Sequence, residues 1–211
     1  MDPIGIFQIL ILCIVMINHW DNFYSSFINI IEPSSFTSWC EKYLYNKKDY
    51  TLFDIGCGNG RDSKFWVDNG WKVIAVDNCF NAYLVTKNHL MTCNSKKWNV
   101  CCTNATDDIY CNSSIIYSRF WLHAVDQETQ NNWLSTFLKY NDIFLTIEAR
   151  TTDQNKHIET YDGHYRRLLC PTLLVDELES YNFKICQKLI GSGLSVYNND
   201  NPELIRILAY K

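Results

Sequence analysis

Basic residues are not in excess in this sequence of 211 residues, and that limits its partners. Nineteen Lys and Arg stand against 23 Asp and Glu, which gives a formal net charge of −4. Proteins that bind nucleic acid generally have a basic excess, so nucleic acid is not expected as a partner, although this balance leaves room for a local basic patch. Apolar residues make up 47% of the chain and charged residues 20%, which indicates a globular domain and not a disordered chain.

The spacing of the cysteines contains no Cys-x-x-Cys pair, although there are ten of them. Cys57, Cys79, Cys101 and Cys102 fall in or beside apolar, strand-like runs. We therefore interpret them as reduced, buried thiols in a reducing compartment. A disulfide framework and a metal site are the alternatives, and no metal site is predicted.

A membrane span of ordinary length is also missing from the N-terminus. The uncharged apolar stretch Ile4–Ile17 is shorter than the roughly 20 residues that a helical span needs. Asp2 precedes it in place of a basic segment, which argues against a signal peptide. Residues 4–17 therefore form a membrane anchor, a helix that packs on the domain or on a partner, or a strand-like extension. We expect a cytoplasmic protein with residues 1–18 as an apolar extension, open to membrane or partner contact, and residues 19–211 as one domain.

From residue 19 onward, apolar runs alternate with amphipathic stretches, which predicts an α/β fold with a mostly parallel sheet between two helical layers. The predicted strands are Thr51–Ile55, Trp71–Val76, Trp98–Cys102, Ser114–Arg119, Asp142–Ala149, Phe183–Ile190 and Glu203–Ala209. The predicted helices are Asp62–Asn69, Asn81–Cys93, Gln127–Tyr140 and Pro171–Tyr181, and Thr151–Cys170 is predicted to be irregular. The last two strands have no helix between them, so they should form an antiparallel hairpin at the sheet edge.

A Gly-x-Gly-x-Gly turn follows the first predicted strand, at Gly56–Gly60. Glycines let the backbone approach a ligand closely, and ligands of open α/β sheets bind beyond the carboxyl ends of the strands. A dinucleotide site would place the third glycine one residue later. Asp54 precedes the turn, and Asp77 ends the second strand, where a carboxylate can accept hydrogen bonds from both ribose hydroxyls. The alternative is an ordinary glycine-rich turn.

Two segments resemble motifs of a known family. Phe53–Asp62 is similar to the first motif of the seven-stranded, Rossmann-like S-adenosylmethionine-dependent methyltransferases, and Val73–Asp77 is similar to the second. The resemblance spans roughly residues 19–211. It implies S-adenosylmethionine as cofactor, a three-layer Rossmann-like fold and the strand order 3-2-1-4-5-7-6.

The resemblance also assigns cofactor contacts. The Gly56–Gly60 backbone would face the methionine part, Asp77 the ribose and Asn78 the adenine. Asn104 stands where the family often has an acidic residue, and its side-chain carbonyl could still accept from the adenine amino group. The candidate cofactor residues are Tyr24, Asp54, Gly56, Cys57, Gly58, Arg61, Asp77, Asn78, Asn104, Ala105 and Ser118.

The region before the first motif resembles small methyltransferases of the tellurite, thiopurine and surface-glycan types. There Trp20, Tyr24 and the segment Pro33-Ser34-Ser35-Phe36 would form a lid over the cofactor. The alternative is that Trp20 and Tyr24 are aromatic core residues.

Basic and histidine residues follow the fourth and fifth strands and so can meet in an acceptor pocket. His123 is the first candidate for a general base and His164 the second, although a single histidine is more often structural. Arg offers planar two-point recognition of carboxylate or phosphate. The candidate acceptor residues are Arg119, His123, Arg150, His164, Tyr165, Arg166 and Arg167. Alternatively, Arg150 pairs with Glu148 or Asp153, and Arg166 or Arg167 faces solvent.

These patterns predict a methyltransferase that acts on an oxygen of a small polar or anionic acceptor, such as a sugar or sugar phosphate. A small molecule or glycan is the expected partner. The fourth strand is followed by no Asn-Pro-Pro-Tyr-type tetrad and no Pro-Cys pair, which disfavours methylation of base amino groups and of cytosine C5. The alternatives are a methyltransferase of RNA, mRNA caps or other macromolecules, a non-catalytic binding module, and a sulfur or metalloid acceptor.

Overall fold

The computed structural model describes residues 19–25, 32–161 and 164–211. The strands of its main sheet are β1 (Thr51–Ile55), β2 (Lys72–Asp77), β3 (Trp98–Cys102), β4 (Ser114–Arg119), β5 (Ile143–Arg150), β8 (Lys184–Gly191) and β9 (Leu204–Tyr210). They lie in the order β3-β2-β1-β4-β5-β9-β8, which confirms the predicted 3-2-1-4-5-7-6. The first five strands are parallel, and β9 runs antiparallel to both β5 and β8. The predicted antiparallel hairpin is therefore present at the sheet edge.

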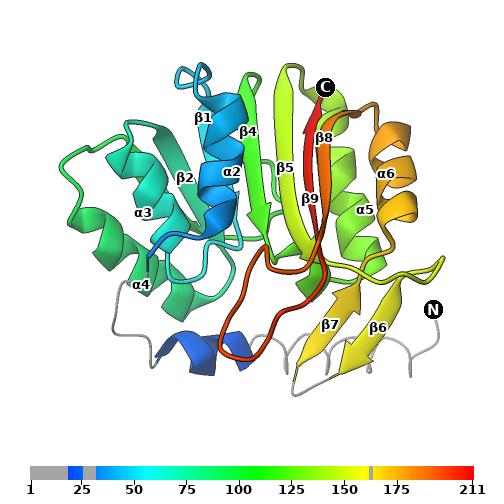
Figure 1. The fold of residues 1–211 in the computed structure, drawn as a ribbon. Coiled ribbons are helices and arrows are strands. Elements are labelled where there is room, and N and C mark those ends of the chain that lie inside the picture. Colours follow the sequence, from blue (N-terminus) through cyan, green and yellow to red (C-terminus); the bar gives the residue numbers. More distant parts are fainter. Residues whose placement is uncertain (1–18, 26–31, 162–163) are drawn as a thin grey trace, which may run out of the picture.

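Helices cover both faces of this sheet (Figure 1). They are α2 (Ser35–Leu44), α3 (Arg61–Asp68), α4 (Phe80–Met91), α5 (Gln127–Thr136) and α6 (Pro171–Ser180), with short 3-10 helices η1 (Leu122–Ala124) and η2 (Phe137–Lys139). Residues 19–25 are also helical. The predicted three-layer α/β architecture is confirmed.

Successive residues of the central strands point to opposite faces of the sheet and build two separate cores. Leu52 of β1 packs in the core that contains Trp66 of α3, whereas its neighbour Phe53 packs in the core that contains Trp133 of α5. All five residues of β1 are buried. A strand covered on both faces reads as a continuous apolar run, which is why these strands are visible in the sequence.

The structure differs from the sequence prediction at β6 (Ile158–Tyr161), β7 (Tyr165–Leu168), α2 and α5. Thr151–Cys170 is not irregular throughout, because β6 and β7 form a separate two-stranded antiparallel sheet. The sequence prediction contains no helix at α2. The predicted helix Gln127–Tyr140 is shorter, because α5 ends at Thr136 and a 3-10 turn follows.

The nine described cysteines are all free thiols, and five of them are buried. Within residues 19–25, 32–161 and 164–211, no group of three or more His, Cys, Asp or Glu side chains is arranged to hold a metal ion.

The structure does not support the expected membrane association. In the described part of the chain, no helix is both long enough and apolar enough to cross a membrane. The stretch from residue 4 to residue 17, on which that expectation was based, lies outside the described residues. The boundary between residues 18 and 19 stays a prediction.

Candidate active site

A cavity of about 960 Å³ lies at the carboxyl ends of the parallel strands, where the sequence places the ligand. Ten of the eleven predicted cofactor residues line it: Tyr24, Asp54, Gly56, Cys57, Gly58, Arg61, Asp77, Asn78, Asn104 and Ala105. Six predicted acceptor residues line it as well: Arg119, His123, Arg150, His164, Tyr165 and Arg166. The structure therefore brings the two predicted groups together in one cavity.

The glycine loop between β1 and α3 takes a backbone path that favours glycine. Gly56 and Gly58 have φ angles of +66° and +57°, in the left-handed region. A Cβ atom on Gly56 would come within 2.8 Å of the Trp121 side chain, and one on Gly58 would collide with the Tyr24 hydroxyl. Glycine at these two positions thus lets Trp121 and Tyr24 pack directly against the loop backbone.

Asp77, at the end of β2, faces this loop. Its carboxylate accepts hydrogen bonds from the backbone N–H groups of Gly58 (3.0 Å) and Cys79 (2.9 Å), one on each oxygen. Burial raises the pKa of Asp77. Each carboxylate oxygen can accept about two hydrogen bonds, so both keep capacity for a pair of ligand hydroxyls.

Asp54 lies beneath the loop at the end of β1, and only 3% of its surface is exposed. It accepts a hydrogen bond from the Ser63 hydroxyl at 2.5 Å. Burial, with the nearby Asp62 carboxylate as the second cause, raises the pKa of Asp54 to about 7. A cationic ligand group beside Asp54 would favour its charged form.

Asp62, which the sequence prediction does not include, is a further acidic residue of this cavity. It accepts from the backbone N–H and the hydroxyl of Ser34, both at 2.7 Å, and from the Tyr117 hydroxyl at 2.8 Å. These bonds join the start of α3 to the start of α2. Asp62 directly follows Arg61 in the first motif, so its position was visible in the sequence but its contacts were not.

At the predicted adenine end of the cavity, Asn78 donates to the side-chain carbonyl of Asn104 at 3.3 Å. That carbonyl is the group predicted to accept from the adenine amino group, so one of its lone pairs is already used. Asp107 accepts from the Asn104 backbone N–H at 3.1 Å and from the Thr103 hydroxyl, which orders the loop after β3.

Ser118 is the predicted cofactor residue that does not line the cavity. Its side chain is fully buried, and its hydroxyl has no hydrogen-bond partner among the described residues. Its side-chain contact with the cofactor stays a prediction without geometric support.

Only the first part of the predicted lid lines the cavity. Trp20 and Tyr24 line the cavity, and their rings stack at a centroid distance of 6.1 Å. Asp21 links this helical segment to the start of α4, because its carboxylate accepts a hydrogen bond from the Asn81 backbone N–H at 3.2 Å. Residues 33–36 do not line the cavity. The Ser34 hydroxyl donates to Asp62 at the start of α3, and Phe36 is buried in the core.

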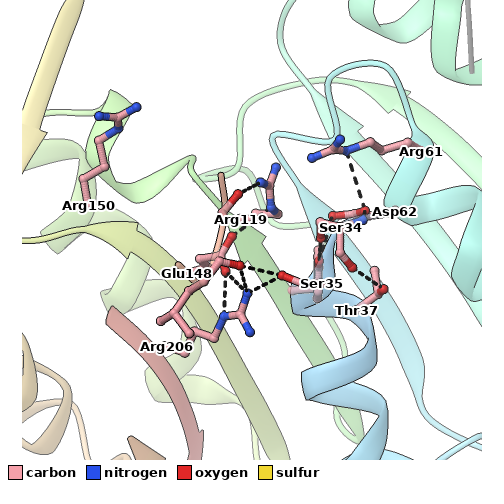
Figure 2. A network of polar contacts seen from close by, with 12 residues as sticks. Ser34, Ser35, Thr37, Arg61, Asp62, Arg119, Glu148, Arg150 and Arg206 are labelled. Atoms are coloured by element: carbon pink, nitrogen blue, oxygen red, sulfur yellow. Dashed lines mark hydrogen bonds and ion pairs between the residues drawn. The ribbon is translucent and has the colours of Figure 1, made fainter. Parts of the chain in front are cut away.

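Two arginines share one buried carboxylate on the acceptor side (Figure 2). Glu148 of β5 accepts from Arg119 Nε at 2.9 Å and from Arg206 Nε at 2.6 Å. Arg119 also donates to the Ser195 hydroxyl at 2.8 Å, and Arg206 donates to the Leu194 carbonyl at 2.9 Å. This Arg119–Glu148–Arg206 network fastens the loop between β8 and β9 to the sheet.

Arg150 pairs with neither Glu148 nor Asp153. Its side chain lies apart from Glu148 (Figure 2), and its partner is Asp200 of the β8–β9 loop. Both carboxylate oxygens of Asp200 accept from Arg150, through its Nη1 and Nη2 atoms. This contact joins residues 50 positions apart.

His123, the first candidate for a general base, lines the cavity with one ring nitrogen already hydrogen-bonded. Only 7% of its surface is exposed, and its Nδ1 accepts from the Arg150 backbone N–H at 3.2 Å. Burial, followed by the charge of Arg150, holds its pKa well below the usual value. The neutral ring therefore keeps its proton on Nε2.

The β6–β7 hairpin supplies the remaining acceptor residues. His164 stacks on His19 with ring centroids 4.6 Å apart, and its Nε2 accepts from Arg166 at 3.1 Å. The Tyr165 hydroxyl donates to Glu159 at 3.0 Å.

Arg167, the fourth arginine of the predicted anion clamp, does not line the cavity. It is 1% exposed and donates to Gln127 at 2.7 Å and to Gln130. The expectation that Arg166 or Arg167 faces solvent is wrong, because Arg166 is half-buried in the cavity and Arg167 is buried against α5.

No family model and no curated protein sequence matches this chain. Solved structures do match it. The [4+2]-cyclase SpnF superposes with a TM-score of 0.71 at 11% identity, over 93% of each chain. An S-adenosylmethionine-dependent methyltransferase from Methanosarcina mazei gives 0.67 at 15% identity, over 80% of this chain and 96% of that one. The chain has the Rossmann-like fold of the class I methyltransferases.

The glycopeptide N-methyltransferase MtfA shares this methyltransferase fold, with a TM-score of 0.65 at 11% identity over 86% of this chain and 98% of that one. These identities are so low that the likeness shows the fold alone. Because N-methyltransferases and a cyclase all have it, the fold does not decide the reaction.

Proposed function

We propose that this protein is an S-adenosylmethionine-dependent methyltransferase that transfers the methyl group to an oxygen of a small polar or anionic acceptor, such as a sugar or sugar phosphate. One observation carries the proposal. A single cavity holds the glycine loop with Asp54 and Asp77 at one end and a cluster of arginine and histidine side chains at the other.

The first end fits the cofactor. The Gly56–Gly58 backbone lines the cavity where the methionine part would lie, and the Asp54 carboxylate, which also lines it, suits the ammonium group of that part. Asp77 keeps capacity for the two ribose hydroxyls. Structures of MtfA with S-adenosylmethionine and with S-adenosylhomocysteine support the same ligand for this fold.

The second end fits an anionic acceptor. The cofactor supplies an electrophilic methyl group on sulfur, and the enzyme must orient the acceptor and exclude water. A hydroxyl acceptor usually needs a base, whereas a carboxylate or phosphate oxygen needs only cations to position it. His123 accepts from backbone at Nδ1 and has a lowered pKa, so an acceptor oxygen that already carries charge suits the site better.

The test is methyl transfer from labelled S-adenosylmethionine to a panel of sugar phosphates, nucleotide sugars, neutral sugars and carboxylic acids. We expect label in anionic members of the panel. At cofactor concentrations below saturation, Asp77→Asn should transfer about tenfold less label, because loss of a charge-assisted hydrogen-bond acceptor weakens cofactor binding by about that factor.

Two results would contradict the proposal. Transfer only to RNA or protein would favour a macromolecular methyltransferase. Failure of S-adenosylmethionine and S-adenosylhomocysteine to bind in calorimetry would favour a non-catalytic binding module.

A further inference from the structure

The ion pair between Arg150 and Asp200 stands in the acceptor end of the cavity. Both side chains line the cavity, and they come from β5 and from the loop between β8 and β9. The Arg150 side chain is 17% exposed and that of Asp200 is 50% exposed. Such a half-exposed pair contributes little to stability, so breaking it costs little.

Other arginine side chains line the cavity beside this pair. Glu148 is shared by Arg119 and Arg206, so these two arginines keep an excess positive charge. Arg119, Arg150 and Arg166 line the cavity together with His123. Their charges, after burial, lower the pKa of His123. An anion in this part of the cavity would be attracted by all three.

Asp200 is held in position by its own backbone. The N–H of Tyr197 donates to the Asp200 carbonyl at 3.0 Å, and the N–H of Asp200 donates to the Tyr197 carbonyl at 2.9 Å. The loop carrying this turn is fastened nearby through Ser195 and Leu194. The carboxylate of Asp200 therefore reaches Arg150 from a defined site, with the two-point geometry that a carboxylate or phosphate ligand would use.

We propose that Asp200 is a specificity-determining residue which occupies the place of the acceptor's anionic group, and that a carboxylate or phosphate acceptor binds by taking Arg150 from it. His123 then donates its Nε2–H to the same anion, since its Nδ1 already accepts from the Arg150 backbone. A neutral acceptor leaves the Arg150–Asp200 pair closed. This proposal rests on the proposed function and names the acceptor class for that site.

The test is a titration of inorganic phosphate against the whole chain, with and without saturating S-adenosylhomocysteine. Trp20 and Trp121 line the cavity, so intrinsic fluorescence can report binding. Asp200→Asn removes the competing carboxylate and should tighten phosphate binding about fivefold, whereas Arg150→Gln should weaken it by about fivefold or more. The double variant that combines Asp200→Asn with Arg150→Gln should bind phosphate no more tightly than Arg150→Gln alone, because Asp200 acts through Arg150.

The matched control is Glu179→Gln on α6, which removes the same charge at an exposed position outside the cavity. It should leave phosphate affinity within about twofold of wild type, because surface charges far apart are screened by salt. Asp200→Ser checks that the effect follows from the lost carboxylate. The proposal is overturned if both Asp200 variants bind phosphate as weakly as wild type or more weakly. It is also overturned if Asp200→Asn tightens phosphate binding equally in the wild-type protein and in Arg150→Gln. Loss of S-adenosylhomocysteine binding with the phosphate pattern intact contradicts the proposed function alone.

Discussion

At the scale of single residues, Asp54 is the group in which burial and charge compete most directly. Burial raises its pKa to about 7, so the carboxyl titrates in the neutral pH range when no ligand is bound. A ligand ammonium would bind the charged form and drive the proton off. Cofactor binding should therefore be linked to pH in the physiological range.

The first prediction concerns this linkage. The dissociation constant of S-adenosylhomocysteine should rise about tenfold between pH 8 and pH 6, because below the pKa of Asp54 each binding event must release a proton. Calorimetry across that range, in buffers with different ionisation enthalpies, measures both the affinity and the proton release. A flat affinity profile would show that Asp54 does not contact the ammonium group.

The control variant is Asp54→Asn, which should bind weakly and without this pH dependence. It should also raise the melting temperature of the ligand-free protein at pH 8. The reason is the sign of the shift: a carboxyl whose pKa is raised by folding costs stability as pH rises from its unfolded value, about 4, to its folded value, and the full cost remains above pH 7. Asn carries no charge, so this cost disappears.

Ser118 gives the second prediction. Its hydroxyl is fully buried without a partner among the described residues, and such a group costs about 1–3 kcal/mol. Ser118→Ala should leave the unfolding free energy unchanged or raise it by about 1 kcal/mol, with unchanged S-adenosylhomocysteine affinity. Denaturant unfolding and calorimetry measure the two quantities. A loss of affinity would instead support the cofactor contact predicted from the sequence.

At the scale of elements, the Arg119–Glu148–Arg206 network connects β4, β5 and β9 to the β8–β9 loop. Removing the charge of Glu148 leaves two arginines without their shared carboxylate. We predict that Glu148→Gln lowers the unfolding free energy by about 3 kcal/mol, in the range for breaking buried ion pairs. Limited proteolysis should also cut faster between residues 191 and 204.

Ser195→Ala is the matched control, because it removes only the hydroxyl that accepts from Arg119. It should cost about 1 kcal/mol, as one hydrogen bond does. Equal losses in the two variants would mean that the buried charges contribute nothing beyond single hydrogen bonds.

The same scale shows which elements a sequence can predict. β1 and β4 are visible because strands buried on both faces are continuous apolar runs. The β6–β7 hairpin is not visible because its buried side includes Arg167, a charged residue that hides the alternation. Arg167 can be buried there only because Gln127 and Gln130 of a distant helix accept its hydrogen bonds.

At the scale of the whole molecule, the sequence predicts the residues that line the cofactor end of the cavity, but only some of those that line the acceptor end. Asp54, Gly56 and Asp77 belong to short motifs whose spacing reports their chemistry directly. Asp200 has no such motif, since its role depends on the return of the β8–β9 loop to Arg150, 50 residues away in the chain. Tertiary pairing of this kind cannot be derived from local pattern.

The last prediction tests the assembled cofactor site through the stability of the whole domain. Saturating S-adenosylhomocysteine at about 100 times its dissociation constant should stabilise the fold by about 2.7 kcal/mol, which corresponds to a rise of about 5–10 °C in melting temperature. At the same ligand concentration, Asp77→Asn should show about half of that rise or less, because a tenfold loss of affinity removes about 1.4 kcal/mol. Asp68→Asn is the control: this exposed residue of α3 pairs with Lys64 at 2.6 Å and should keep the full rise. Differential scanning calorimetry measures all three proteins, and an equal rise in both variants would show that Asp77 does not hold the ligand.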